Sequence, residues 1–447
     1  MINTKLENLN INLKEDTEEQ PNDEFIKYKE NNEEAKILEE ISEYLNNKDT
    51  RESFQSSILE VSNSPIVKLL DLLIKQAIKM RASDIHIEPF ANNLRIRYRI
   101  DGDLKEISNL PKAAHSPLIT RIKIIGNMDI ADKRVPQDGR IENRIDDKII
   151  DMRISTIPTI YGEKVVLRLL DRDNFLLTKS EIGFTDKNYE SFNRLIHQPF
   201  GMILITGPAG SGKTTTLYAI LEELNKIEKN IITIEDPVEY KLDGINQIQI
   251  NPKAGLTYAS GLRAILRQDP DIIMIGEIRD SETAKIAIRA AVTGHLVLTT
   301  LHTKDSSSAI TRLIDMGIEP YLVSAAVAGV VSQRLVKKLC NHCKVPYEAS
   351  YSEKVLLGLN PQKKIILYKP KGCHRCDSGY HGRTAVHEVM IVSEKIRKII
   401  NSGMSIDEIR KTAIEDGMTT IMDNSVELAI KGVSSLEEIL KVCFSLS

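Results

Sequence analysis

The sequence predicts an α/β protein: a larger domain with a mostly parallel sheet, preceded by a smaller α+β domain. Three observations support this prediction. Apolar segments of strand length, "MILIT", "NIITIED", "DIIMIGE" and "HLVLTTLH", alternate with segments of helical spacing after residue 199. A glycine-rich loop lies between the first of these strands and its helix. Before residue 172, strictly alternating segments such as "NNLRIRYRIDGDL" indicate antiparallel strands instead.

The loop "GPAGSGKTTTLY" at 207–218 has the G-x-x-x-x-G-K-[ST] spacing of a phosphate-binding loop. In such a loop backbone N–H groups surround the phosphates, Lys213 adds a positive charge, and the following helix adds its dipole. The Thr214 hydroxyl is the expected Mg²⁺ ligand. A Gly-rich turn without this role is the less favoured alternative, since strand, loop and helix occur in the required order. Nucleotide contacts are expected from Gly207, Pro208, Ala209, Gly210, Ser211, Gly212, Lys213, Thr214 and Thr215.

Several of the predicted core strands have polar ends. Glu277 follows "DIIMI", where a carboxylate beside a phosphate loop can activate water or hold Mg²⁺. Gly276 stands where an aspartate is usual, which favours the role of general base. Glu235 ends another strand, and His295 and His302 belong to a third. Ligands bind at the carboxyl edge of parallel sheets, so we expect these side chains there, although a single histidine is more often a packed core residue.

Arg263 and Arg267 are four residues apart in "GLRAILRQDP" and therefore share one helical face. Positive charge near the phosphates would stabilise a transferring phosphoryl group. The alternative is an exposed pair on a helix surface.

The first 58 residues form an acidic segment. Residues 1–60 carry 16 acidic and 7 basic side chains, a balance of −9 in a chain of net charge −3. We expect this segment to be disordered or to dock on a partner through Ile37, Leu38, Ile41 and Leu45; a solvated leader without a role is equally compatible. Neither a signal peptide nor a membrane-spanning segment is expected, which indicates a cytoplasmic protein without direct membrane insertion.

The expected division of the chain has four parts: the acidic segment 1–58, an α+β domain 59–172, a polar linker 173–198 and the larger domain 199–447. The larger domain is expected to include C-terminal helices over 391–445. The arginine face of "LRIRYRI" is more often a solvated sheet surface than a ligand site. Nucleic acid is not expected as a partner, because aromatic stacking residues are sparse there.

Four of the five cysteines, Cys340, Cys343, Cys373 and Cys376, have the spacing C-x₂-C-x₂₉-C-x₂-C. Two such pairs predict a tetrahedral Zn²⁺ site in a module at about 338–380. A redox pair is the alternative, but it explains only one C-x-x-C.

These motifs together resemble the hexameric ATPases of type II secretion and type IV pilus assembly. The resemblance covers about 60–445 and includes "ASDIHIEP", "RVPQDGRI", "IITIEDPVEY", "GLRAILRQDPDIIMIGEIRD" and "TGHLVLTTLH". It implies a RecA-like P-loop motor domain that binds ATP and Mg²⁺ through Lys213 and Thr214, with Glu277 as general base. It also implies an acidic box with Glu235, a histidine box with His295 and His302, and phosphate contacts from Arg153, Arg168, Arg263 and Arg267.

The resemblance further implies a homo-hexamer that powers assembly of a pilus or pseudopilus in secretion, pilus extension or DNA uptake. Such a motor is held at the inner membrane by a platform protein and a cytoplasmic docking protein. The tetracysteine pattern is typical of the secretion and extension branch, which disfavours a pilus retraction motor. A nucleic-acid-translocating P-loop ATPase is disfavoured by the net acidity of the chain. A scaffold that binds ATP without hydrolysing it is disfavoured by the intact Lys213 and Glu277.

Overall fold

The computed structural model describes residues 65–145, 148–171, 181–376, 378–403 and 405–444. The chain divides into two compact units, one up to Asn174 and one from Phe175 onward. Each unit has its own sheet and its own hydrophobic core. The acidic segment 1–58, with its proposed docking face, lies outside the described residues.

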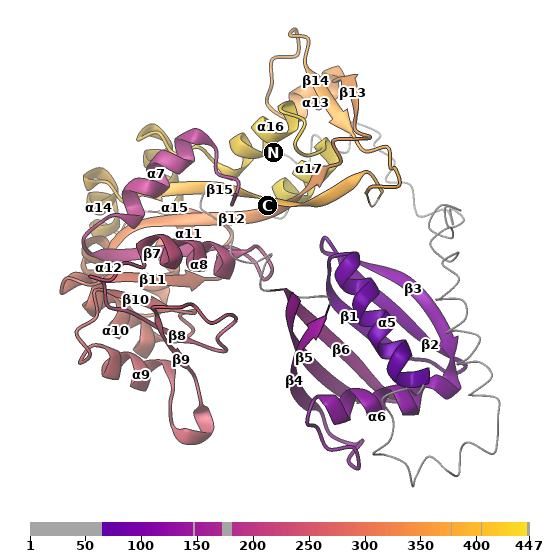
Figure 1. Ribbon diagram of the computed structural model, residues 1–447. Coiled ribbons are helices and arrows are strands. Elements are labelled where there is room, and N and C mark those ends of the chain that lie inside the picture. Colours follow the sequence, from indigo (N-terminus) through magenta and orange to yellow (C-terminus); the bar gives the residue numbers. More distant parts are fainter. Residues whose placement is uncertain (1–64, 146–147, 172–180, 377, 404, 445–447) are drawn as a thin grey trace, which may run out of the picture. The chain divides into compact units, whose positions relative to one another are not determined.

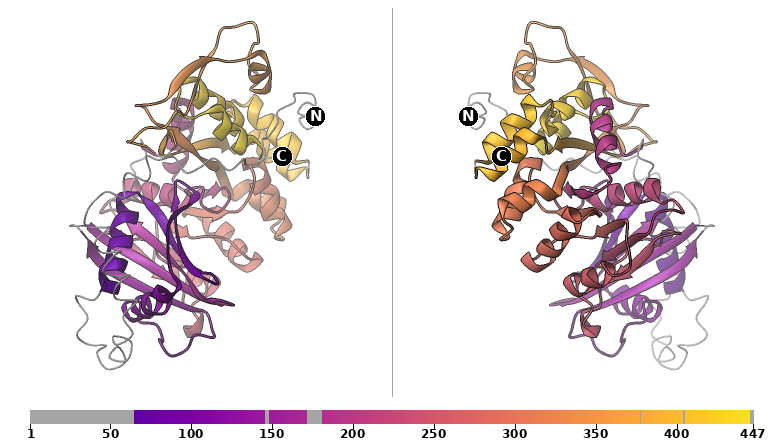
Figure 2. Two further views of the ribbon diagram at one scale, coloured as in Figure 1. Left: turned by 90° about the vertical axis from the view of Figure 1, so that its right-hand side faces the viewer. Right: turned by 90° about the vertical axis from the view of Figure 1, so that its left-hand side faces the viewer.

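The first unit is a six-stranded sheet with two helices on one face (Figures 1 and 2). The strand order is β3-β2-β1-β6-β5-β4, and all neighbouring strands are antiparallel. The elements in chain order are α5 (Pro65–Lys79), β1 (Ala82–Pro89), β2 (Asn93–Ile100), β3 (Asp103–Pro111), the 3₁₀ turn η2 (Lys112–Ala114), α6 (His115–Ile125), β4 (Gln137–Ile145), β5 (Lys148–Thr159) and β6 (Gly162–Asp171).

The alternating pattern of β2 produces an apolar face and a charged face. Its even-numbered residues 94–100 are buried against α5 and α6, and the Tyr98 hydroxyl donates a hydrogen bond to the Leu73 carbonyl at 2.7 Å. The arginines of the other face are not simply solvated. Arg97 donates to Glu88 of β1 at 2.8 Å, and Arg95 lies 3.1 Å from the same carboxylate. Burial opposes ionisation of Glu88, but the hydrogen bonds and charges of Arg97 and of Lys164, which lies 2.9 Å away, lower its pKa to about 2.

The second unit is built on a seven-stranded sheet, β15-β12-β7-β11-β10-β8-β9, in which only β15 is antiparallel to its neighbour. Its elements up to β12 are α7 (Asp186–Ile196), β7 (Gly201–Thr206), α8 (Lys213–Leu224), β8 (Ile231–Glu235), β9 (Asn246–Gln249), η4 (Pro252–Ala254), α9 (Tyr258–Ile265), β10 (Ile272–Ile275), α10 (Ser281–Val292), β11 (Leu296–Leu301), α11 (Ser306–Asp315), α12 (Pro320–Ala326) and β12 (Val327–Leu339). The mostly parallel sheet predicted from the sequence is confirmed.

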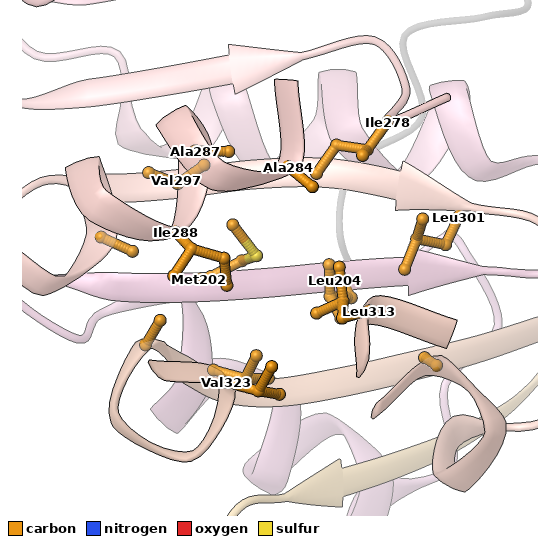
Figure 3. Packing of buried hydrophobic residues seen from close by; sticks show 14 of the residues in the cluster. Met202, Leu204, Ile278, Ala284, Ala287, Ile288, Val297, Leu301, Leu313 and Val323 are labelled. Carbon is orange, nitrogen blue, oxygen red and sulfur yellow. The ribbon is translucent and has the colours of Figure 1, made fainter. Parts of the chain in front are cut away.

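The core of this unit lies between the sheet and the helices α9 to α12, and it also includes buried residues of α14 and α15. Met202 and Leu204 of β7 and Val297 of β11 point into this layer and pack among side chains of α10, α11 and α12 (Figure 3). The intervening residues of β7, Ile203 and Ile205, are equally buried on the opposite face, so the strand reads as a continuous apolar segment. That pattern is typical of a parallel strand covered on both sides.

The segment expected as a polar linker, 173–198, contains helix α7. Phe192 of this helix is fully buried and stacks on Phe184, with 4.3 Å between ring centroids. The Asn188 side chain donates to the His387 carbonyl of β15 at 3.0 Å. The expectation of a connector over this whole segment is therefore wrong for 186–196, where a few apolar residues at helical spacing suffice to anchor a polar helix on the sheet.

The rest of the unit follows β12 and contains the cysteines. Its elements are β13 (Val345–Glu348), α13 (Tyr351–Leu356), β14 (Ile366–Lys369), β15 (Tyr380–Ile391), α14 (Glu394–Asn401), α15 (Ile406–Glu415), α16 (Ile421–Ile430) and α17 (Leu436–Phe444). β13 and β14 form a separate two-stranded sheet at one end of the β12–β15 pair, close to α16 and α17 (Figure 1). A second hydrophobic cluster joins this module to α16 and α17.

Candidate nucleotide and metal sites

The glycine loop lies between β7 and α8, as its motif predicts. Gly207, Gly210 and Gly212 have φ values of 150°, 73° and 86°, a region that other residues rarely adopt. Gly212 is the residue before α8, whose first residue is Lys213. Pro208, Ala209 and Gly210 are exposed, while Ser211 and Lys213 are buried and Thr214 and Thr215 are half-buried. The loop therefore has an open rim and a closed base at the N-terminus of a helix, which is a favourable place for an anion.

Lys213 extends back over this loop. Its ammonium group donates hydrogen bonds to the carbonyl oxygens of Gly207 at 3.0 Å and Pro208 at 2.9 Å. Burial lowers the pKa of Lys213 to about 8, and the nearby negative charge of Glu277 opposes that shift. A phosphate group at the loop would raise this pKa again, because an adjacent anion stabilises an ammonium ion.

Glu277 follows β10 and is held by two cationic partners. Its carboxylate lies 2.5 Å from the Arg279 guanidinium, and its other oxygen lies 3.3 Å from Nε2 of His302. Burial opposes ionisation of Glu277, but the hydrogen bonds and charges of Arg279 and His302 outweigh it and leave the pKa below its ordinary value. Glu277 is thus an anion at neutral pH, as an acceptor of a proton from water must be.

Glu235, at the end of β8, is buried and fully engaged within the protein. Its carboxylate accepts hydrogen bonds from the Tyr218 hydroxyl at 2.5 Å, the Thr233 hydroxyl at 2.6 Å and the Gln247 amide at 3.3 Å. Burial raises its pKa despite these donors. This arrangement fixes the end of β8 against α8 and positions the strand rather than exposing the carboxylate.

The two histidines lie at opposite ends of strand β11. His302 follows β11, beside Glu277, whereas His295 precedes the strand and its Nδ1 donates to the Ala290 carbonyl at 3.0 Å. Six strand residues separate them, about 20 Å. The expectation that both lie at the carboxyl ends of the strands is therefore wrong for His295. The segment "TGHLVLTTLH" spans the whole of β11, so its two histidines lie at different ends of the strand.

The four arginines are in two groups. Arg263 pairs with Glu282 of α10 at 2.5 Å, and Arg267 donates to the Arg263 carbonyl at 2.8 Å. Arg153 and Arg168 are register partners on β5 and β6 of the first unit. Arg168 lies 3.1 Å from Asp84. Contact of these arginines with nucleotide phosphates stays a prediction.

Two residues that contact the candidate nucleotide site were not predicted from the sequence. Arg279 holds Glu277 and lies 3.8 Å from Asp236, and it could have been suspected as a charged neighbour of the strand-end acid. Gln333 of β12 hydrogen-bonds the phosphate loop from a position 117 residues beyond Thr216. No local pattern in "SQRLV" marks it, because the contact depends on which strand lies beside β7.

The four cysteine sulfurs converge as the spacing predicts. They lie within 4.8 Å of one another, with separations of 3.9 Å between Cys340 and Cys373 and 3.6 Å between Cys343 and Cys376. Each pair closes a tight turn, with the Cys343 and Cys376 amides donating to the Cys340 and Cys373 carbonyls. Four sulfurs at 2.3 Å around a tetrahedral metal are about 3.8 Å apart. The donor set therefore fits a Cys₄ metal centre, and none of the four forms a disulfide.

Phosphate loop, strand-end acid and parallel sheet together define a P-loop nucleotide-binding protein with a RecA-like fold. The family model for type II/IV secretion system proteins matches residues 60–441, and the chain belongs to this family.

Among the relatives, the type II secretion system ATPase E of Vibrio cholerae is 48% identical over 85% of this chain and 76% of its own. The type IV pilus assembly ATPase PilB of Thermus thermophilus is 48% identical over 90% of this chain but only 46% of its own length.

Solved structures show the same fold. The pilus retraction motor PilT with bound ADP is 26% identical, with a TM-score of 0.57 over 83% of this chain and 96% of its own. The ATPase DotB of Legionella pneumophila is 20% identical with a TM-score of 0.63, over 84% of this chain and 95% of its own.

Within the described residues, none of the helices combines the length and apolarity needed to cross a bilayer.

Proposed function

We propose that this protein hydrolyses ATP to power assembly of a pilus or pseudopilus. The observation that carries the proposal is that Lys213 and Glu277 both follow the carboxyl ends of parallel strands of one sheet, β7 and β10, which are separated only by β11. Family membership and the names of the relatives, secretion and pilus-assembly ATPases, support the same activity.

In this mechanism each group has one task. The loop N–H groups and Lys213 bind the phosphates of ATP, and the Thr214 hydroxyl would hold Mg²⁺. Mg²⁺ would supply positive charge that neutralises the phosphate oxygens during transfer. Glu277 accepts the proton of the attacking water, and Arg279 and His302 orient its carboxylate. The chain's own residues thus provide binding at the loop and proton transfer at the end of β10.

The Cys₄ cluster would hold Zn²⁺, which would supply a tetrahedral link between the two cysteine turns. We expect one Zn²⁺ per chain. Its role is structural, because all four donors are thiolates of the protein and no coordination position is left open for a substrate.

The motor acts as a homo-hexamer on an inner-membrane platform protein, and a cytoplasmic docking protein recruits it. This part of the proposal rests on the resemblance to the secretion and pilus-extension branch, including its tetracysteine module. The proposal keeps Arg153, Arg168, Arg263 and Arg267 as contacts to the nucleotide phosphates, from the same subunit or from a neighbouring one. It also keeps His295 in the nucleotide site, although this residue lies at the other end of β11 from His302.

ATP turnover by the purified full-length chain tests the central proposal. Phosphate release that requires Mg²⁺ and disappears in Lys213→Ala supports it, and a folded chain without turnover or nucleotide binding refutes it. Mass measurement with and without ADP tests the hexamer. A chain that starts near residue 58 tests docking: it should keep its nucleotide affinity and lose membrane recruitment in cells, whereas unchanged recruitment would place docking elsewhere.

A further inference from the structure

Strand β12 continues past the point where β7 ends. Ser332 is the register partner of Thr206, the last residue of β7. Gln333, the next residue, therefore lies beside the point where β7 ends and the phosphate loop begins. It is only 2% exposed, so both polar atoms of its side chain need partners inside the protein.

Both partners of Gln333 belong to the loop and its helix. Nε2 donates to the Ser211 carbonyl at 2.7 Å, and Oε1 accepts from the Thr216 hydroxyl at 2.7 Å. The orientation of the amide is determined chemically, because a carbonyl can only accept and must therefore face the NH₂ group. One side chain thus connects the end of the loop with the first turn of α8.

The shape of the loop fits closely around the same residue. A Cβ on Gly207 would lie 2.4 Å from the Gln333 carbonyl oxygen, and a Cβ on Gly212 would lie 2.8 Å from its Nε2. Two glycines of the phosphate-loop motif are therefore required by contact with Gln333 as well as by their backbone angles.

The hydrogen bond to Ser211 also orients a donor for phosphate. In a planar trans peptide the C=O and N–H point in opposite directions. The Ser211 carbonyl is held toward Gln333 of β12, so the N–H of Gly212 in the same peptide points away from that side chain. Since Gly212 has few steric restrictions on its backbone, this peptide would rotate easily without the anchor.

We propose that Gln333 is a positioning residue of the nucleotide site, which orients the 211–212 peptide so that its N–H can bind phosphate. The inference rests on the proposed function, since it concerns how this loop holds ATP and ADP. Gln333 contacts the loop and not the reacting atoms, so its removal should affect nucleotide affinity more than the chemical step.

The test compares four single variants of the full-length chain by ADP titration and steady-state ATP turnover. Gln333→Met keeps a similar side-chain volume and loses both hydrogen bonds, and we expect roughly tenfold weaker ADP binding because a buried carbonyl loses its donor. Its kcat at saturating ATP should fall less than threefold. Thr216→Val removes only the bond at the helix, so its ADP affinity should change less than threefold.

Ser332→Ala is the matched control, a buried neighbour on the same strand whose hydroxyl has no hydrogen-bond partner among the described residues. It should bind ADP like the unmodified chain. Lys213→Ala is the positive control for lost phosphate binding. Circular dichroism at the assay temperature confirms that each variant is folded. If Gln333→Met does not fold, Gln333→Asn replaces it, because its amide is one methylene too short to reach Ser211.

The outcomes separate the two proposals. If the unmodified chain binds no nucleotide, the proposed function fails. If it binds ADP and a folded Gln333 variant binds equally well, the inference is wrong, and a fall in melting temperature alone would show a purely structural role. An equal loss in Thr216→Val would also overturn it, because the effect would then come from the helix and not from the 211–212 peptide.

Discussion

The phosphate loop and the tetracysteine cluster both have a contact with strand β12 or its end, but their geometry is maintained in different ways. Gln333 of β12 contacts the loop, and Cys340 follows the end of that strand seven residues later. The loop owes its shape to glycines, and its carbonyl groups accept hydrogen bonds from the side chains of Lys213 and Gln333. The four thiols face one another, and as thiolates they would repel without a cation between them.

This difference indicates which site is preformed. The chain alone provides the geometry of the phosphate loop, so we expect it to persist without ligand. The cysteine module brings together two turns that are 33 residues apart, and its geometry depends on what binds the sulfurs. The two sites should therefore respond independently to changes that affect only one of them.

The largest expected effect is on turnover. Glu277→Gln removes the proton acceptor and should lower kcat by about 10² to 10⁴, while ADP affinity stays within about threefold because the loop is intact. Phosphate-release kinetics and ADP titration measure the two quantities. Glu222→Gln, an exposed acid on α8, is the matched control. Normal turnover in the Glu277 variant would exclude this residue as the base.

The next effect is on nucleotide binding. Lys213→Ala removes a charged donor to phosphate and should weaken ADP binding by roughly 10- to 100-fold. Its zinc content, measured by elemental analysis, should equal that of the unmodified chain. A parallel loss of zinc would show that the two sites are coupled and would contradict their independence.

Binding should also depend on pH because burial lowers the pKa of Lys213 to about 8. Below pH 8 the lysine is already protonated, and affinity should be constant. Above pH 8 binding must take up a proton, so ADP affinity should fall by about tenfold per pH unit. Calorimetry in buffers of different ionisation enthalpy detects this proton uptake. Lys213→Arg, which stays charged, should show no such fall, and a flat profile for both proteins would refute the assignment.

The smallest effect on the nucleotide site should follow loss of the metal. Cys376→Ser or chelation should destabilise the module of β13, α13 and β14 and raise its amide hydrogen exchange, since structural zinc contributes to folding. ADP affinity should remain within about threefold of the unmodified chain. A loss as large as that of Lys213→Ala would show that the loop depends on the cysteine cluster.

The sequence predicted those features whose residues are close together in the chain. The phosphate loop, the acid after β10 and the two cysteine pairs each have local spacing rules that follow from their chemistry. Gln333 could not be found this way, because its role depends on the pairing of β12 with β7. His295 and His302 show the converse, since closeness in the sequence placed them together although a strand of about 20 Å separates them.

Helix α7 was missed for a related reason. Its composition is polar, and only Phe192, Leu195 and Ile196 are both apolar and buried. The stabilisation that these side chains provide depends on the surface of β12 and β15 that they cover. That surface is formed by residues up to almost 200 positions later, such as His387. Long-range packing of this kind overrides local composition.

The attachment of the cysteine module to the sheet has a consequence for how such proteins can diversify. Leu339 at the end of β12 is paired with Tyr380 at the start of β15, so both ends of the module leave the sheet from one pair of neighbouring residues. An insertion of this kind can lengthen, shorten or disappear without shifting the register of any sheet strand. What limits such change is the buried cluster that Leu367 of β14 shares with Ile421 of α16 and Ile439 of α17, so a shorter module requires new polar residues on those two helices.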